Sequence, residues 1–380
     1  MRKLLKIDYN SRVINLKKIG VFSTNISESM GGIDNMSYNL VVYLSKRCEV
    51  EGYSGPVKIE EKLNNVFYTN GKLLNIKGAI EVISKFAKSH KLKKFNYNLA
   101  LTWKVGLLTY FIKILFKVPY VVYIHGNEIY PNKTGFLYKL LIKLVFKNAS
   151  LIIANSEYTK KLSSYYGNDY NVKVIHPGVT FKESVKIDDY VDITKEGKSL
   201  ILLSVGRLVK RKGIDNTIKS LKYLVKKYPN IKYIIAGKGN YEKELRKIIE
   251  ENQLQDYVVL KGEVSEEEKN KLYEMCDLFL MPSYEIEKDG DVEGFGIVYL
   301  EANRHGKFVI AGNSGGISDA VINNKTGFIV DGTNPQEIAK AVDRFFTEVY
   351  GKKDYKRDCI NWALEHDWNI IIDKLMEYIF

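Results

Sequence analysis

Cysteine and histidine are scarce in this sequence, and their placement excludes two common devices. The three cysteines, Cys48, Cys276 and Cys359, are far apart, so they offer neither a disulfide framework nor the short spacing of a metal site. The five histidines show no paired spacing either. We therefore expect no protein-bound metal and no other cofactor.

Long apolar runs are also lacking. No segment of the sequence reaches the roughly 20 apolar residues that span a bilayer. Residues 1–18 are basic but do not contain the apolar stretch of a signal peptide. We therefore expect the protein to be cytoplasmic.

Acidic residues are outnumbered, with 45 Asp and Glu against 58 Lys and Arg, which gives a net charge of +13. A basic surface suits phosphate-rich partners such as nucleotides, nucleic acid or an anionic membrane. The basic residues are not interleaved with an aromatic platform, so we expect no nucleic-acid partner.

Short apolar runs alternate with longer segments of helical period. Fully apolar runs between helices are typical of parallel strands that are covered on both faces. Residues 180–199 between the two halves are charged and aperiodic, which is typical of a linker. The pattern predicts an α/β fold with two doubly wound Rossmann-like domains, residues 1–182 and 183–366, facing across a cleft. The expected strands are 19–23, 99–103, 120–124, 150–154, 172–175, 200–205, 231–236, 257–260, 277–281 and 307–311.

Ligands of such sheets bind beyond the carboxyl ends of the strands, so the loops that follow the apolar runs are the places to search. After the run 200–205, Gly206 permits a tight turn, and Arg207 and Lys212 stand near a helix N-terminus. Two cations there oppose the helix dipole unless an anion lies between them. The alternative is a solvated basic turn, since Lys210 and Arg211 are charged as well.

Two further loops carry glycines after a strand. Gly237 and Gly239 follow the run 231–236 and allow the backbone to approach a ligand, but no loop completes a GxGxxG pattern, which disfavours a dinucleotide dehydrogenase. Ser314, Gly315 and Gly316 form a similar turn after the run 307–311.

The stretch GDVEGFGIVYLEANRHG contains two acids around a Gly-Phe-Gly turn. A helix is expected from Ile297 to Arg304, and its first N–H groups would suit a phosphate. Glu293 precedes this helix and Glu301 lies within it; carboxylates accept hydrogen bonds from sugar hydroxyls. The alternative for Glu301 is a surface acid that pairs with Lys307 or Arg304. Taken together, the loops fit a nucleotide sugar.

Several stretches, in order, resemble the retaining glycosyltransferases of family 4, which have the GT-B fold. The resemblance runs from about residue 19 to the C-terminus, and the two glutamates with their flanking glycines are fairly specific. The stretches are ESMGGIDNMSYNLVVYLSKR, VVYIHGNE, LIIANSEYTKKL, VIHPGV, SVGRLVKRKG, DVEGFGIVYLEA and AGNSGGISDAV…KTGFIVD.

The resemblance implies roles for individual residues. Arg207 and Lys212 would neutralise the donor diphosphate, Glu301 would bind the ribose, and Glu293 would contact the transferred sugar. The catalytic set would be His125, Arg207, Lys212 and Glu293, without a metal. Further donor contacts would come from main-chain groups at Gly31, Gly32, Gly206, Gly237, Glu263, Val264, Gly294, Phe295, Gly296, Ile297 and Val298.

His125 and the C-terminus take their expected roles from the same resemblance. His125 would lie near the sugar and align the reacting groups, although a histidine that ends an apolar strand is often a satisfied core group. The helix 367–380 would cross back onto the first domain. Residues 1–18 receive no role.

Residues 136–148 bear on the acceptor. Lys139, Lys143 and Lys147 share one helical face there, which would suit an anionic membrane surface. The alternative is an ordinary amphipathic helix that packs on its own sheet.

The sequence thus predicts a retaining, metal-independent glycosyltransferase. It would move a sugar from a UDP- or GDP-linked donor to a glycan or lipid-linked acceptor in surface polysaccharide or glycolipid synthesis, in the cytoplasm or at the inner membrane face. Two alternatives stay open: a sugar-nucleotide epimerase or hydrolase, and a non-catalytic nucleotide-sugar-binding protein.

Overall fold

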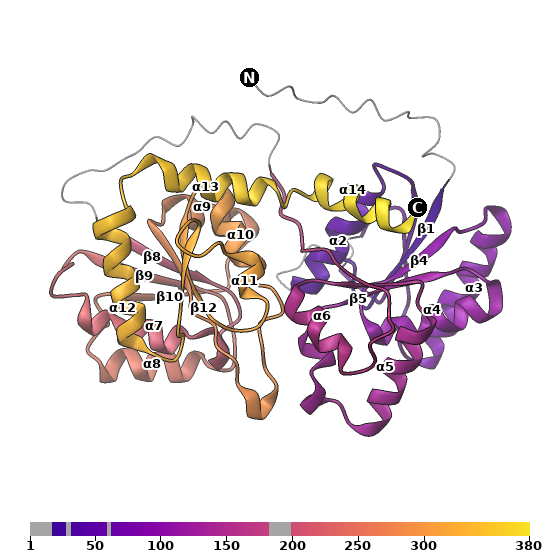
Figure 1. The fold of residues 1–380 in the computed structure, drawn as a ribbon, viewed down its shortest axis with the longest axis horizontal. Helices are drawn as coiled ribbons and strands as arrows, with labels where there is room; N and C mark the ends of the chain where they lie inside the picture. Colours follow the sequence, from indigo (N-terminus) through magenta and orange to yellow (C-terminus); the bar gives the residue numbers. More distant parts are fainter. Residues whose placement is uncertain (1–16, 28–31, 59–61, 182–198) are drawn as a thin grey trace, which may run out of the picture.

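The chain forms two α/β domains that lie side by side, each built on one parallel sheet (Figure 1). The computed structural model describes residues 17–27, 32–58, 62–181 and 199–380. The expected boundary at 182/183 and most of the expected linker fall outside these residues, as does nearly all of the segment 1–18.

The N-terminal sheet has seven strands in the order β3-β2-β1-β4-β5-β6-β7. They are β1 (Lys18–Ser23), β2 (Glu49–Ser54), β3 (Val66–Tyr68), β4 (Tyr97–Ala100), β5 (Tyr120–Ile124), β6 (Leu151–Ala154) and β7 (Val172–Val174). The helices of this domain are α2 (Gly32–Leu44), α3 (Ile76–Leu92), α4 (Trp103–Phe116), α5 (Phe136–Asn148) and α6 (Glu157–Ser164).

The C-terminal sheet has six strands in the order β10-β9-β8-β11-β12-β13. They are β8 (Leu200–Val205), β9 (Ile231–Ala236), β10 (Val258–Gly262), β11 (Leu278–Met281), β12 (Phe308–Gly312) and β13 (Gly327–Val330). The α-helices that follow β8 are α7 (Ile214–Ser220), α8 (Glu242–Glu251), α9 (Glu266–Met275), α10 (Ile297–Arg304), α11 (Ile317–Ala320), α12 (Pro335–Arg344), α13 (Lys353–Leu364) and α14 (Trp368–Ile379).

Alternate residues of the N-terminal strands enter two separate cores. Val21 of β1 and Val121 of β5 pack with side chains of α2 and α14, whereas Phe22 and Val122 pack with side chains of α3, α4 and α5. Successive side chains of a strand point to opposite faces, so both faces of this sheet are buried. That burial explains why its strands β5 and β6 read as apolar runs.

The last helix belongs to the N-terminal domain in space. The chain crosses between the domains before Trp368, and α14 then packs against α2 (Figure 1). Arg47, just beyond α2, donates to Asp373 at 2.9 Å and to Asn369 at 3.0 Å, both on α14. The C-terminus therefore ties the two domains together.

Three strands were not among those expected from the sequence. β2 and β3 form one side of the N-terminal sheet; β2 reads EVEGYS, with two acids and a glycine, and β3 has only three residues. β13 follows a turn-rich segment and ends the other sheet. Strands this short or this polar carry too little periodic signal to be recognised.

Candidate active site

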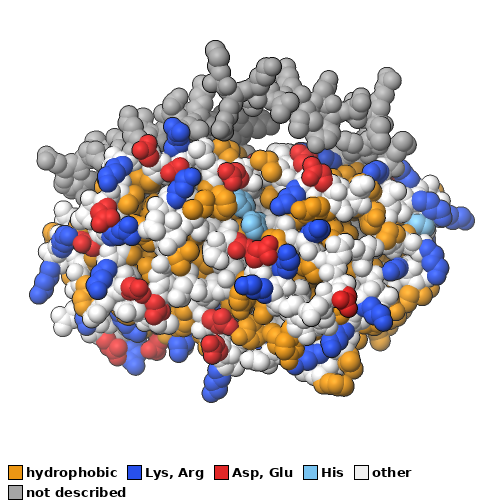
Figure 2. Space-filling model, in the orientation of Figure 1, with side chains coloured by type: hydrophobic (Ala, Val, Ile, Leu, Met, Phe, Trp, Pro, Cys, Tyr) orange, Lys and Arg blue, Asp and Glu red, His pale blue; other side chains and the backbone are white. Residues whose placement is uncertain are grey.

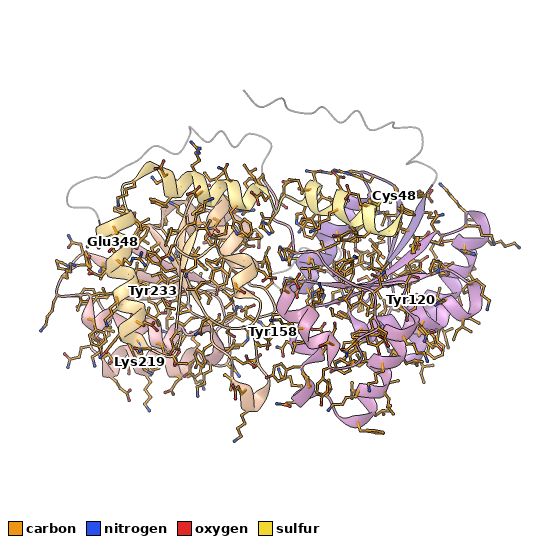
Figure 3. The ribbon with its side chains drawn as sticks, in the orientation of Figure 1. Cys48, Tyr120, Tyr158, Lys219, Tyr233 and Glu348 are labelled. Carbon is orange, nitrogen blue, oxygen red and sulfur yellow. The ribbon has the colours of Figure 1, made fainter. Side chains whose placement is uncertain are left out.

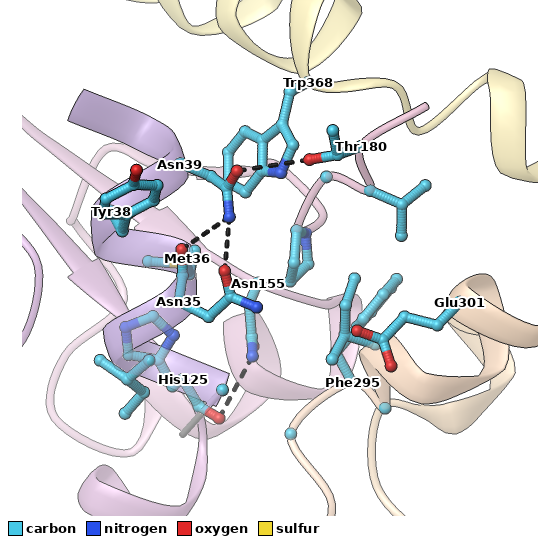
Figure 4. Close-up of a pocket in the computed structure, with 18 of the residues that line it drawn as sticks. Asn35, Met36, Tyr38, Asn39, His125, Asn155, Thr180, Phe295, Glu301 and Trp368 are labelled. Carbon is cyan, nitrogen blue, oxygen red and sulfur yellow. Dashed lines mark hydrogen bonds between the residues drawn. The ribbon is translucent and has the colours of Figure 1, made fainter. Parts of the chain in front are cut away.

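A cavity of about 990 Å³ lies between the two domains. Figure 4 shows α2 with Asn35, Tyr38 and Asn39 on one side, Glu301 of α10 on the other, and Trp368 above. The cavity is large enough for a nucleotide sugar, since small-molecule sites commonly measure about 300–1,000 Å³.

The turn after β8 brings basic residues to this cavity. Arg207 is exposed and lines it, together with Arg211. Gly206 adopts φ 154° and Gly213, the cap of α7, adopts φ 69°, which favours glycine. A Cβ at Gly237 would fall 1.9 Å from the Gly206 carbonyl oxygen, so this glycine lets two ligand-side loops pack together.

Lys212 and Glu293 contact each other directly. The Lys212 ammonium donates to Glu293 Oε2 at 2.5 Å, and the Arg211 guanidinium donates to the same oxygen at 2.7 Å. Arg211 also lies 3.2 Å from Asp291. The sequence prediction placed Lys212 on a phosphate and Glu293 on a sugar, but here Glu293 Oε2 holds both cations.

Burial alone would raise the pKa of Glu293, but the charges of Lys212 and Arg211 outweigh burial and hold it at about 2. The carboxylate is therefore ionised at all physiological pH values. With Asp291 beside Arg211, the two cations and the two acids of this cluster balance, so an anion at the adjoining cavity wall would be favoured mainly by Arg207.

The loop before α10 lies where the two domains touch. A Cβ at Gly294 would fall 2.0 Å from the His125 carbonyl oxygen, and one at Gly316 would fall 2.1 Å from the Gly294 carbonyl oxygen. Ser156 donates its hydroxyl to the same Gly294 carbonyl at 2.7 Å. Gly296, with φ 94°, caps α10 without a side chain, so the first N–H groups of the helix receive no side-chain cap.

The side chain of Glu301 on α10 is 12% exposed and points into the cavity (Figure 4). It accepts hydrogen bonds from Tyr273 at 3.0 Å and from Lys269 at 3.2 Å, both on α9. Burial raises the pKa of Glu301, but Lys269 and Arg304 more than offset it, so its pKa is lowered. The alternative paired Glu301 with Lys307 or Arg304 at the surface; its side-chain hydrogen bonds run to α9 instead, while the charge of Arg304 also acts on it.

His125 directly follows β5 and lines the cavity. Its Nε2 lies 2.8 Å from the Leu101 carbonyl oxygen, which can only accept, so Nε2 carries a proton. Its main-chain N–H donates to Glu128 at 2.7 Å. The ring is thus fixed by a core hydrogen bond, and Nδ1 is the nitrogen left for a ligand.

Polar contacts close the cleft on the side of α6. Tyr130 donates to Glu285 at 2.6 Å, Asn127 donates to Asp291 at 3.0 Å, and the Glu157 main-chain N–H donates to Asp319 at 2.6 Å. Figure 3 labels Tyr158 of α6 at the boundary between the domains. In each pair one residue comes from each domain, so the structure is a closed form.

The predicted site residues fall into three groups. Those that line the cavity are Gly32, His125, Arg207, Glu293, Gly294, Phe295, Gly296, Ile297 and Glu301. Described residues that lie near it but outside its lining are Gly206, Lys212, Gly237, Glu263, Val264 and Val298. Gly31 lies outside the described residues. The donor contacts assigned to all of them stay predictions.

Sequence reasoning missed two features of the cavity wall. Arg211 was given no role and entered only the alternative of a solvated turn, yet it is 5% exposed and holds Glu293. On α2, Asn39 donates to Asn35 at 2.5 Å and accepts from Thr180 at 3.3 Å. The i, i+4 spacing of the two asparagines was a usable signal in the sequence. For Arg211 there was none, because nothing in the stretch KRKG distinguishes the buried arginine from the basic residues beside it.

Two facing parallel-sheet domains with a charged cleft between them define a GT-B protein. Solved structures agree over nearly the whole chain: sucrose-phosphate synthase from Thermosynechococcus elongatus has a TM-score of 0.74 and 17% identity, covering 95% of this chain and 98% of that one. HepE from Anabaena, in complex with UDP and glucose, has a TM-score of 0.73 and 19% identity, covering 96% and 99%. These likenesses show the fold.

Sequence comparisons give the family. Residues 30–183 match Glycosyltransferase Family 4 and residues 186–362 match Glycosyl transferases group 1. A GDP-mannose-dependent alpha-(1-6)-phosphatidylinositol monomannoside mannosyltransferase from Mycobacterium tuberculosis is 34% identical over 265 residues, which cover 67% of this chain and 68% of the relative. The chain belongs to glycosyltransferase family 4. It is a glycosyltransferase, as the sequence predicted, rather than an epimerase or a binding protein.

Proposed function

We propose that this glycosyltransferase moves a hexose from a GDP- or UDP-linked donor to a hydroxyl group of a glycolipid or lipid-linked glycan. The observation that carries the proposal is the cavity wall where Arg207, the glycine loop before α10 and Glu301 come together. The name of the mycobacterial relative favours GDP-mannose and a phosphatidylinositol glycoside as the substrate classes to test first.

The donor diphosphate would lie between Arg207 and the N-terminus of α10. Both cations of the buried cluster contact Glu293 Oε2, so we assign Glu293 Oε1 to a hydroxyl of the transferred sugar. Glu301 would accept from the ribose hydroxyls. These groups are held before substrate arrives, which is the condition for electrostatic stabilisation of a transition state.

In the reaction, the bond between the anomeric carbon and the phosphate oxygen breaks, and its electron pair leaves with the diphosphate. The acceptor oxygen bonds to the anomeric carbon from the same face and loses its proton to the departing phosphate oxygen. Arg207 and the α10 amides stabilise the charge that develops there, a contribution of ~10²–10³ in rate for a single donor in comparable sites. We propose that no metal is needed and expect transfer to persist in EDTA; a loss of activity restored by Mg²⁺ would refute this part.

A thermal-shift screen against nucleotides and nucleotide sugars tests the donor site. We expect one nucleotide class to raise the melting temperature, and Arg207→Ala and Glu301→Gln to remove most of that shift. Lys247→Gln, at an exposed ion pair with Glu251 on α8 and outside the cavity lining, is the matched control. An unchanged shift in both site variants would contradict the assignment.

The face of α4 and α5 supports a membrane-bound acceptor. In α5 the buried residues are Ile142, Val145 and Phe146. Large apolar residues of both helices are instead exposed, and lysines stand among them, as the lower right of Figure 2 shows over this region. The exposed apolar residues are Phe111, Ile114, Leu115, Phe136, Leu137, Leu140 and Leu144.

This arrangement differs from the ordinary amphipathic helix, in which leucines pack inward and lysines remain in water. Apolar side chains with interspersed lysines suit the headgroup region of an anionic bilayer. None of the helices in the described parts of the chain is long and apolar enough to cross a membrane. We propose that the α4–α5 face rests on the membrane surface that carries the acceptor.

A further inference from the structure

Two histidines lie on the two segments that cross between the domains. His176 follows β7, and His366 lies between α13 and α14. The crossing segments are joined by main-chain hydrogen bonds, from the Val179 N–H to the His366 carbonyl at 2.8 Å and from the Trp368 N–H to the Val179 carbonyl at 3.3 Å. Any change in the domain arrangement must therefore pass through this pair of segments.

The two imidazoles belong to one chain of polar contacts. His366 Nδ1 lies 2.9 Å from the Trp362 carbonyl oxygen, and His366 Nε2 lies 3.2 Å from His176 Nδ1. His176 Nε2 lies 3.4 Å from Asp319 Oδ2. The two rings lie at 15° to each other, with their centroids 5.3 Å apart.

This row of three polar contacts needs more protons than two neutral imidazoles carry. Its ends, the Trp362 carbonyl and the Asp319 carboxylate, can only accept, so each of its three contacts needs one proton on a nitrogen. Two neutral imidazoles supply two. The geometry is satisfied in full only when the pair holds one extra proton.

The pKa values of the two groups on either side of His176 bear on that proton. Burial lowers the pKa of His366 to about 4, so His366 is the neutral member. Burial would raise the pKa of Asp319, but the bonds from His176 and from the Glu157 N–H outweigh it, so the acid is ionised. The other charged groups around the groove beside His176 are Glu157, Lys160, Lys173 and Lys374.

The His176 ring lies against the loop that precedes α10. The His176 ring stacks on Phe295, with centroids 5.1 Å apart and planes at 28°. Phe295 is 2% exposed and sits between Gly294 and Gly296, the glycines that shape the N-terminus of α10. Asp319 accepts from α6 of the N-terminal domain as well, so one carboxylate connects the histidine chain, both domains and the donor side of the cleft.

We propose that His176 is a positioning residue that holds Phe295 and the closed cleft only while the His176–His366 pair carries an extra proton. The proposal rests on the donor site proposed above for its functional consequence, but not for the proton itself. Loss of the proton leaves one contact of the chain between two acceptors, which weakens the hold on Asp319 and loosens the donor loop. Donor binding therefore favours the protonated pair and weakens as pH rises.

Histidine ¹⁵N spectra test the proton directly, because the chain has only five histidines. Long-range ¹H–¹⁵N correlations at pH 7.5, assigned with His176→Gln and His366→Gln, should show one imidazolium shared by the pair. In Asp319→Asn, which keeps the shape but removes the charge, the pair should become neutral at that pH. Two neutral rings in the wild type would overturn the proposal.

Titration calorimetry with GDP and with UDP at pH 7.0 and 8.5 tests the coupling. Because the nucleotide phosphate also titrates, the comparison is with His176→Phe, which keeps an aromatic ring against Phe295. We expect affinity to fall several-fold more in the wild type than in His176→Phe, and an equal fall in both would overturn the positioning role. If neither nucleotide binds at either pH, the donor site fails, while the ¹⁵N spectra still decide whether the proton is present.

Discussion

Gly294 of the C-terminal domain lies against the main-chain carbonyl of His125 in the N-terminal domain. A Cβ at Gly294 would fall 2.0 Å from that oxygen and 3.1 Å from Asn155 Nδ2. The two residues belong to loops that follow strands in opposite sheets, so this contact sets how closely the domains approach at the cavity.

Gly294→Ala should therefore hold the cleft open. Overpacking of this kind costs about 1–3 kcal/mol in the closed form, and backbone rather than a flexible side chain is the obstacle. We expect transfer to fall roughly 5- to 150-fold, from the relation between free energy and rate, and the radius of gyration from small-angle scattering to rise.

Gly135→Ala is the matched control, because an added methyl group there meets nothing within 4 Å. Its activity and scattering should equal those of the wild type. Wild-type activity in Gly294→Ala would show that the closed contact is not used in the reaction.

The sequence predicted the layers of the fold better than their edges. The runs 120–124, 200–205 and 231–236 coincide with β5, β8 and β9, because parallel strands covered on both faces are mostly apolar along their length. The helix Ile297–Arg304 was also predicted with its bounds. β2 and β3 were missed because their positions toward the sheet edge tolerate acids and short length.

The partners within the site could not be read from the sequence. Glu301 was given Lys307 or Arg304 as partners by proximity along the chain, yet Lys269 and Tyr273 come from another helix. Arg211 and Lys212 are buried while Lys210 is exposed, because a 3-10 turn over these three residues decides which side chains face Glu293. Such distinctions depend on tertiary packing and produce no periodic pattern in the sequence.

Glu293 should make the stability of the protein depend on acid pH. Its pKa is 4.5 in the reference state and about 2 in the fold, so the stabilisation it provides is complete above about pH 4.5 and is lost as pH falls toward 2. The full effect is on the order of 3 kcal/mol at 1.36 kcal/mol per pKa unit.

The measurement is the slope of the unfolding free energy against pH between 5 and 3. Glu293→Gln will be less stable at every pH because Arg211 and Lys212 lose their counter-charge, but its slope should be shallower than that of the wild type. Glu348, labelled in Figure 3, forms an exposed ion pair with Arg344, and Glu348→Gln should keep the wild-type slope. Equal slopes in wild type and Glu293→Gln would contradict the lowered pKa.

Glu301 should be specific for the ribose. Glu301→Gln keeps the shape of the side chain, and Lys269 retains Glu266 at 2.9 Å, so we expect the fold to persist. A hydrogen bond to a charged group contributes about 1.5–3 kcal/mol, so nucleotide affinity should fall about 10-fold or more.

A nucleotide that lacks both ribose hydroxyls separates this role from a general effect. The wild type should bind it about 10-fold more weakly than it binds the normal nucleotide, as expected for a lost charged hydrogen bond. Glu301→Gln should bind the two nucleotides equally well. Glu274→Gln, which lines the same cavity from α9, should behave as the wild type. An undiminished penalty in Glu301→Gln would place the ribose elsewhere.

Membrane binding through the α4–α5 face should respond differently to loss of charge and loss of apolar contact. The triple variant Lys139→Gln, Lys143→Gln, Lys147→Gln should lose most binding to vesicles with an anionic lipid and lose its salt dependence, at about 1 kcal/mol per lysine near the surface. The triple variant Leu137→Ser, Leu140→Ser, Leu144→Ser removes exposed side chains, so it should keep its stability but detach at all salt concentrations. Sedimentation with vesicles at low and high salt measures both, and the absence of wild-type binding at low salt would remove the membrane proposal while leaving the donor site intact.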